Sequence, residues 1–136
     1  MPLLETAGGG AIVALASTAG LFGYPLRSAY AASKWAVIGL VKSLAIELGP
    51  SQIRVNAVCP GSVEGPRMAR VIAAEAASRG VAPAAVRTAY ERTVSLHTFV
   101  TAEDIAATVL FLCSDAGARI SGQALAVDGD THTLAG

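Results

Sequence analysis

Tyr30 and Lys34 stand four residues apart in the stretch YAASK, at the start of a long apolar segment. Residues four apart on a helix share one face, so the phenol and the ammonium are expected to point the same way. A neighbouring positive charge favours the phenolate and lowers the pKa of a tyrosine from its ordinary value of about 10. Such a phenol can act as a general acid or base near neutral pH. Taken alone, a Tyr and a Lys at this spacing are more often an ordinary surface pair.

A serine hydroxyl precedes this pair along the chain. Ser17 directly follows the apolar run 11–16, which is typical of a strand buried on both faces of a parallel sheet. In open α/β sheets, ligands bind at the carboxyl ends of the strands, and the first turn of the following helix can face that edge. We therefore expect Ser17, Tyr30 and Lys34 to meet at one cleft.

The elements that must position these residues alternate between strands and helices. The predicted strands are 11–16, 53–59 and 124–127, and the predicted helices are 28–48, two short ones on an arm within 64–94, and one from Thr101 to about 114. This alternation implies right-handed crossovers and a parallel sheet. Glycines 8–10 precede a strand, which predicts a plain turn, because a phosphate loop needs its glycines between a strand and a helix.

Composition argues against several classes of partner. Ten basic and ten acidic residues give a net charge of zero with no block of like charge, so we expect no nucleic-acid and no membrane-surface partner. The apolar stretch 35–48 is interrupted by polar residues and is shorter than the ~20 residues of a membrane span. Cys59 and Cys113 lack metal-ligand spacing, and we predict two buried, reduced thiols in a cytoplasmic protein.

Four stretches carry a resemblance to a known family. They are ALASTAG with Ser17, SAYAASKWAVIGLVKSLAIELG with Tyr30 and Lys34, IRVNAVCPG, and ISGQALAVDGD. With this spacing, residues 1–136 resemble the short-chain dehydrogenase/reductase family over essentially their whole length. The resemblance implies an α/β fold: the C-terminal half of a doubly wound Rossmann-type parallel sheet, with three strands and flanking helices.

The resemblance also implies an activity and a role for each site residue. A family member is an oxidoreductase that uses NAD or NADP to interconvert a small-molecule alcohol and a carbonyl. Tyr30 would be the general acid/base, Lys34 would hold the nicotinamide ribose and keep the tyrosine acidic, and Ser17 would orient the substrate oxygen. The loop with Pro60, Gly61 and Val63 would pass along the nicotinamide, with the Val63 backbone near its carboxamide. Gly65 stands where the family usually has a threonine that contacts the carboxamide.

The family's glycine-rich nucleotide fingerprint and a catalytic asparagine lie upstream of the region that this chain resembles. We therefore expect the 136-residue chain by itself to bind dinucleotide weakly and to be inactive. The alternative is a catalytically inactive remnant that serves as an oligomerising or interaction module.

Apolar surface is abundant for so small a protein, with 53% hydrophobic residues and a mean hydropathy of +0.54. The helix 28–48 is apolar nearly all round, and in the resembled family its second face packs on the same helix of a partner. We therefore predict a homo-oligomer through this helix, disrupted by Asp at Ile38 or Val41, with Trp35 either in the core or in the interface. The strand 11–16 is expected to form a bare apolar edge of the sheet.

The predicted arm offers four candidate arginines among those it contains: Arg67, Arg70, Arg87 and Arg92. They could contact a substrate, and a solvated helical face would explain them equally well.

Overall fold

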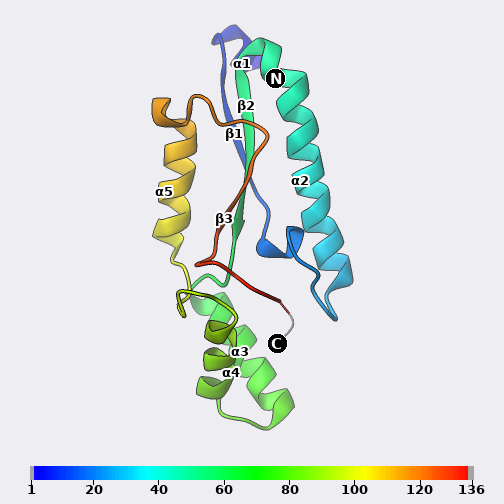
Figure 1. Ribbon diagram of the computed structural model, residues 1–136, viewed down its shortest axis with the longest axis vertical. Helices are drawn as coiled ribbons and strands as arrows, with labels where there is room; N and C mark the ends of the chain where they lie inside the picture. Colours follow the sequence, from blue (N-terminus) through cyan, green and yellow to red (C-terminus); the bar gives the residue numbers. More distant parts are fainter. Residues whose placement is uncertain (1, 135–136) are drawn as a thin grey trace.

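The computed structural model describes residues 2–134. Three parallel strands form one sheet in the order β1-β2-β3: Gly10–Leu15, Ile53–Pro60 and Ala124–Val127. The helices are α1 (Pro2–Thr6), α2 (Ser28–Leu48), α3 (Pro66–Arg79), α4 (Pro83–Arg92) and α5 (Ala102–Cys113). Helix α2 covers one face of the sheet and α5 the other, while α3 and α4 lie together beyond one end of the strands (Figure 1). This confirms the predicted fold class.

Strand β2 forms the centre of the molecule. Its alternate residues Ile53, Val55, Ala57 and Cys59 are essentially fully buried and join Ile38 and Val41 of α2 in one apolar cluster. Asn56 and Val58 in between are buried as well, because α5 covers the opposite face, whereas Arg54 is half-buried. The apolar residues around Arg54 and Asn56, followed by Pro60 and Gly61, made β2 visible in the sequence. Strand β1 lies at the edge of the sheet, as predicted.

The register brings the carboxyl ends of all three strands to one edge. Leu15 of β1 pairs with Val58, and Pro60 pairs with Val127 at the end of β3. The segments that leave the sheet after β1 and β2, together with the start of α2 and the pair α3 and α4, therefore gather at the same end of the molecule (Figure 1).

Local signals set the ends of the elements. Thr101 Oγ1 accepts a hydrogen bond from the Asp104 backbone N–H at 3.2 Å, and the Asp104 carboxylate accepts one from the Thr101 N–H at 2.8 Å. This capping box starts α5 where the sequence predicted. Gly8 and Gly9 have positive φ and join α1 to β1, so the glycine run is the helix-to-strand turn that its position indicated.

The orientation of α2 differs from the prediction. Ile38 and Val41 are buried, at 6% and 2% exposure, and they face the sheet. Asp at these positions would therefore disrupt the core directly, so a broken assembly or a precipitate would not identify them as interface residues. The outward face carries Trp35, Leu40 and Ile46, which are 52%, 58% and 79% exposed, so core packing does not cover Trp35.

The length of α2 is relevant to whether this helix could cross a membrane. The segment Ser28–Ser51 is long and apolar enough, by length and composition, to cross a membrane. The stretch 35–48, which was considered as a membrane span, is shorter than this segment because α2 also includes residues 28–34. One such helix is weak grounds for a span, and this one packs Ile38 and Val41 against the sheet.

The two cysteines lie in different environments. Cys59 is fully buried in β2, whereas Cys113 is exposed, and both are free thiols. The prediction that both would be buried is wrong for Cys113. Leu112 is the residue that α5 turns toward the interior, and the next residue along a helix points about 100° away from it.

Candidate active site at the strand ends

Lys34 links α2 to the end of β1. Its Nζ donates a hydrogen bond to the Leu15 carbonyl at 3.4 Å. The short 3-10 helix Thr18–Gly20, which follows β1, packs against the same turn of α2. A Cβ on Gly20 would lie 2.9 Å from the Lys34 carbonyl oxygen, a distance that real Cβ contacts do not reach. The start of α2 is therefore held close to the segment that contains Ser17.

Tyr30 and Lys34 share one face of α2, as their spacing predicted. The Lys34 Nζ lies 5.7 Å from the centroid of the Tyr30 ring. The Tyr30 ring also makes an edge-to-face contact with Tyr24, with centroids 6.5 Å apart and planes at 75°. Tyr30 is 36% exposed, and its hydroxyl has no hydrogen-bond partner among residues 2–134. The phenol is thus fixed by its ring while its hydroxyl is open to a ligand.

Ser17 immediately follows the strand end that Lys34 contacts. Its backbone is extended, and its Oγ accepts a hydrogen bond from the Ala19 N–H at 3.2 Å, which caps the 3-10 helix. A serine hydroxyl that accepts one hydrogen bond still has its own proton to donate. Ser17 therefore has a local structural role that leaves its donor available.

The thiol of Cys59 contacts the backbone of Ser17. Burial in the core raises the pKa of its thiol, while a hydrogen bond with the Ser17 backbone acts in the opposite direction. The charge of Asp128 raises this pKa further and that of Lys34 lowers it. A buried thiol with a raised pKa is a poor nucleophile. We therefore interpret Cys59 as packing support for Ser17.

The loop after β2 presents unpaired backbone groups. Val100 donates its N–H to the Ser62 carbonyl at 3.0 Å and accepts from the Glu64 N–H at 2.8 Å. Because these bonds use the neighbours of Val63, the N–H and C=O of Val63 itself point away from Val100. Neither has a partner within the described part of the chain. An unpaired backbone N–H in this loop can donate a hydrogen bond to a bound ligand.

Two glycines shape this loop. Gly61 donates its N–H to Val127 at 3.1 Å, and a Cβ there would lie 2.7 Å from the Cβ of Asp128. Gly65 has φ 143° and ψ 179°, a conformation essentially restricted to glycine. A threonine at this position, as in the usual family pattern, would therefore be strained in this loop.

One of the four candidate arginines on the arm has a structural role. Arg87 donates to both carboxylate oxygens of Glu64, at 3.0 and 2.6 Å, and to Glu91 at 2.8 Å. Its guanidinium also lies 4.5 Å from the Phe99 ring centroid. The hydrogen bond from Arg87 holds the pKa of the Glu64 carboxyl below its usual value. Arg87 thus ties α4 to the loop after β2, a role that neither of the sequence-based alternatives foresaw.

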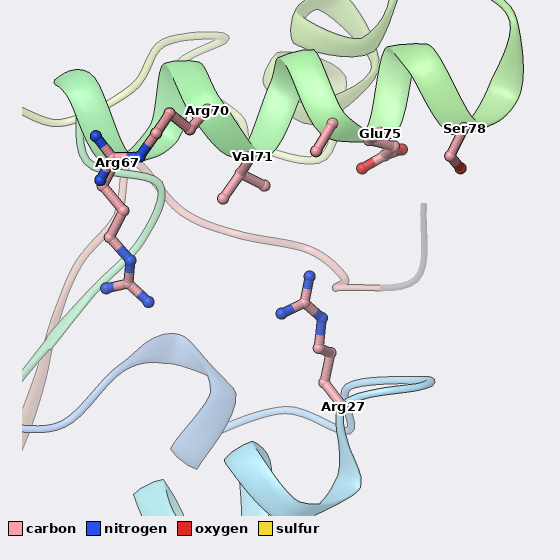
Figure 2. Close-up of a pocket in the computed structure, with 7 residues that line it drawn as sticks. Arg27, Arg67, Arg70, Val71, Glu75 and Ser78 are labelled. Carbon is pink, nitrogen blue, oxygen red and sulfur yellow. The ribbon is translucent and has the colours of Figure 1, made fainter.

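A cavity of about 460 Å³ opens between α3 and the start of α2 (Figure 2). Its lining consists of Arg27, Arg67, Arg70, Val71, Ala74, Glu75 and Ser78. Sequence reasoning singled out Arg67 and Arg70 and missed Arg27. The signal was an arginine one helical turn before Tyr30, at an N-cap position where Ser, Thr, Asp or Asn is usual.

Known proteins resemble this chain in sequence and in structure. The family model described as enoyl-(acyl carrier protein) reductase matches residues 1–132. Trans-4-hydroxycyclohexanecarboxylate dehydrogenase from Sinomonas cyclohexanicum is 40% identical over 129 residues, which cover 95% of this chain and 43% of the relative. A short chain dehydrogenase family protein from Francisella tularensis superimposes with a TM-score of 0.85 at 33% identity, over 90% of this chain and 50% of that one.

A second solved structure, of NAD+-bound xylitol dehydrogenase, gives a TM-score of 0.83 at 31% identity, over 91% of this chain and 50% of that one. The chain spans about half the length of the relatives it matches. The sequence match and the structural match extend over nearly the whole chain. This protein belongs to the short-chain dehydrogenase/reductase family.

Proposed function

We propose that this chain forms the catalytic and substrate-binding half of an NAD(P)-dependent oxidoreductase that interconverts a small-molecule alcohol and a carbonyl. The observation that carries the proposal is the pairing of Tyr30 and Lys34 at the strand ends. A phenol with an open hydroxyl lies beside an ammonium that is hydrogen-bonded to the end of β1. Relatives with dehydrogenase activity, one of them solved with NAD+ bound, support the same reading.

Each site residue has a step that its chemistry suits. The Tyr30 hydroxyl gives a proton to the substrate oxygen in reduction and accepts one in oxidation. The Lys34 ammonium lies beside the Tyr30 ring, and its remaining N–H groups hold the ribose hydroxyls of the cofactor. The Ser17 hydroxyl donates to the substrate oxygen and orients it.

The residues after β2 fit the nicotinamide end of the cofactor. Pro60 and Gly61 carry the chain tightly past Asp128, and the unpaired Val63 N–H is free to donate to a carboxamide. When bound, the nicotinamide supplies the hydride acceptor or donor. The choice between NAD and NADP is made at the adenosine ribose, which in this class of fold is contacted by the first strands of the sheet.

The test is turnover, followed by the absorbance of reduced nicotinamide with a panel of small alcohols and ketones. The chain is assayed alone and fused behind the nucleotide-binding half of the Sinomonas relative. Tyr30→Phe removes the transferable proton and should lower kcat of the active form by at least about 100-fold, the usual contribution of a general acid or base. Lys34→Ala should raise the cofactor KM and lower kcat, since the ammonium has two roles.

The matched control is Tyr24→Phe, which keeps the ring that packs on Tyr30 and removes a hydroxyl that has no assigned role. It should retain activity. Near-normal turnover in Tyr30→Phe, with the fold intact by circular dichroism, contradicts the proposed role of Tyr30.

We also infer that the outward face of α2 mediates assembly into a homo-oligomer. Trp35, Leu40 and Ile46 are large, apolar and more than half exposed on this face. Contiguous apolar surface of this kind marks interaction sites in soluble proteins. The same face would serve an inactive interaction module, which would show no turnover. Turnover that is lost in Tyr30→Phe therefore distinguishes the oxidoreductase from the module.

A further inference from the structure

The cavity between α2 and α3 concentrates unpaired positive charge. Arg67 and Arg70 form no salt bridge and no side-chain hydrogen bond with any residue from 2 to 134. Arg27 has no ion pair there either, and its guanidinium lies 6.0 Å from the Tyr24 ring centroid. In Figure 2, Arg27 extends from the start of α2 toward α3, and Arg67 extends from α3 toward the α2 side. Arg70 lies along α3 (Figure 2), so three arginines without an ion pair among residues 2–134 line one cavity.

Glu75 is the one carboxylate in the lining of this cavity, and it is already neutralised. It accepts hydrogen bonds from Arg79 at 2.7 Å and from the Tyr90 hydroxyl at 2.9 Å. The hydrogen bond from Arg79 is the main reason why the pKa of Glu75 is lowered, and the charge of Arg27 adds to it weakly. Burial and the bond to Glu75 raise the pKa of Tyr90 to about 12, so this donor stays protonated. A net excess of positive charge remains in the cavity.

The placement of these arginines opposes helix stability. Arg27 occupies the N-cap of α2 and Arg67 lies in the first turn of α3, and neither first turn contains an acidic residue. The N-terminal end of a helix carries a partial positive charge, which favours anions and disfavours cations. Two cations at such ends, facing one cavity, are better explained by a bound anion than by their contribution to the fold.

The cavity is adjacent to the candidate active site. The Arg27 guanidinium lies over the Tyr24 ring, 6.0 Å from its centroid, and Tyr24 contacts Tyr30 edge to face. We propose that the cavity binds the anionic group, a carboxylate or a phosphate ester, of a small hydroxy or keto substrate whose oxygen reacts at Tyr30. Guanidinium groups bind such oxyanions with paired hydrogen bonds, and Val71 and Ala74 offer an apolar wall to the carbon chain between the two ends. The Tyr30 end of this assignment rests on the proposed function.

The first test is calorimetric titration of the purified chain with two matched pairs of probes. The anions are 3-hydroxybutyrate and glycerol 3-phosphate, and the neutral partners are 1,3-butanediol and glycerol. We expect at least one anion to bind measurably better than its neutral partner, and the tighter anion identifies the group as carboxylate or phosphate. Absence of binding by both anions, or equal binding by the neutral partners, overturns the proposal.

Substitutions locate the binding. Arg67→Gln and Arg70→Gln should each weaken anion affinity by about tenfold or more, the usual effect of losing a charge-assisted hydrogen bond. Arg67→Lys should retain part of the affinity because it keeps the charge. The control is Arg92→Gln, which removes an exposed arginine of α4 outside the cavity lining and should leave the affinity unchanged. Unchanged anion affinity in both cavity variants places the anion elsewhere and overturns the proposal.

The anion site and the proposed oxidoreductase function can be contradicted independently of each other. Tyr30→Phe should keep the anion affinity, so binding without any turnover in the fused protein contradicts the oxidoreductase and leaves the anion site standing. Conversely, turnover of neutral alcohols that equals turnover of anionic ones, with kcat/KM unchanged in Arg67→Gln, contradicts the anion site and leaves the oxidoreductase standing.

Discussion

Replacing Gly61 by alanine tests whether the loop after β2 depends on a close approach to the end of β3. Gly61 lies at the point where both strands end, and its N–H bonds the Val127 carbonyl at 3.1 Å. A methyl group at this position would lie 2.7 Å from the Cβ and 2.9 Å from the Cα of Asp128. Asp128 cannot turn aside easily, because its carboxylate accepts hydrogen bonds from the N–H groups of Asp130 and Thr131.

The magnitude follows from these distances. Carbon atoms pack favourably at about 3.5 Å or more, so the two segments must separate by roughly 0.8 Å (3.5 − 2.7). Overpacking of this kind typically costs about 1–3 kcal/mol. The same movement would stretch the hydrogen bond between Gly61 and Val127 to nearly 4 Å, a loss of about 1 kcal/mol. We therefore expect Gly61→Ala to lower the free energy of unfolding by about 2–4 kcal/mol.

The assay is urea unfolding followed by far-ultraviolet circular dichroism, at one protein concentration for all variants. Gly39→Ala is the matched control, since it makes the same chemical change in the exposed middle of α2, with no atom within 4 Å of the added methyl. That substitution should raise the free energy of unfolding by up to about 1 kcal/mol, because alanine favours a helix over glycine. Equal or greater stability of Gly61→Ala would refute the reasoning about this contact.

Three further predictions concern the capping box, the thiols and the outward face of α2. Thr101→Ala removes the side chain that caps α5 and should lower the free energy of unfolding by about 1 kcal/mol in urea titrations. The hydrogen bond from the Thr101 N–H holds the pKa of Asp104 below its ordinary value of 3.8. The Asp104 carboxylate therefore stabilises the fold above pH 3.8, and this stabilisation is lost as the pH falls through the lower pKa of the folded state. Asp104→Asn should lack that acid-dependent loss of stability in thermal melts, and a pH profile identical to that of the wild type would contradict the role of Asp104. A thiol reagent should modify Cys113 rapidly and Cys59 only on unfolding, as followed by mass spectrometry, and rapid modification of both would show that β2 is accessible. Ile46→Asp places a charge on the outward face of α2 without touching the core and should reduce the assembly size in light scattering, whereas a wild-type chain that is monomeric at all concentrations would contradict the oligomer.

The order and bounds of the main elements could be predicted from the sequence because their signals are local. Gly49 and Pro50 end α2 at Leu48, the Thr101–Asp104 box starts α5, and the apolar residues of β2 mark it as a strand of the core. The pairing of Tyr30 with Lys34 was equally visible, since it depends on helical spacing alone. The strand that precedes Ser17 placed this pair at the ligand-binding edge of the sheet.

Other features are decided by contacts between distant segments. Helix α2 is apolar on nearly every side, so its sequence did not reveal that Ile38 and Val41, rather than Trp35, face the sheet. The exposure of Cys113 depends on where the cover of α5 ends. The presence of Arg27, Arg67 and Arg70 around one cavity requires the arm to fold back over the start of α2. Periodicity reports which residues are apolar and how they are spaced, while the surface that each face meets is set by the packing of the whole chain.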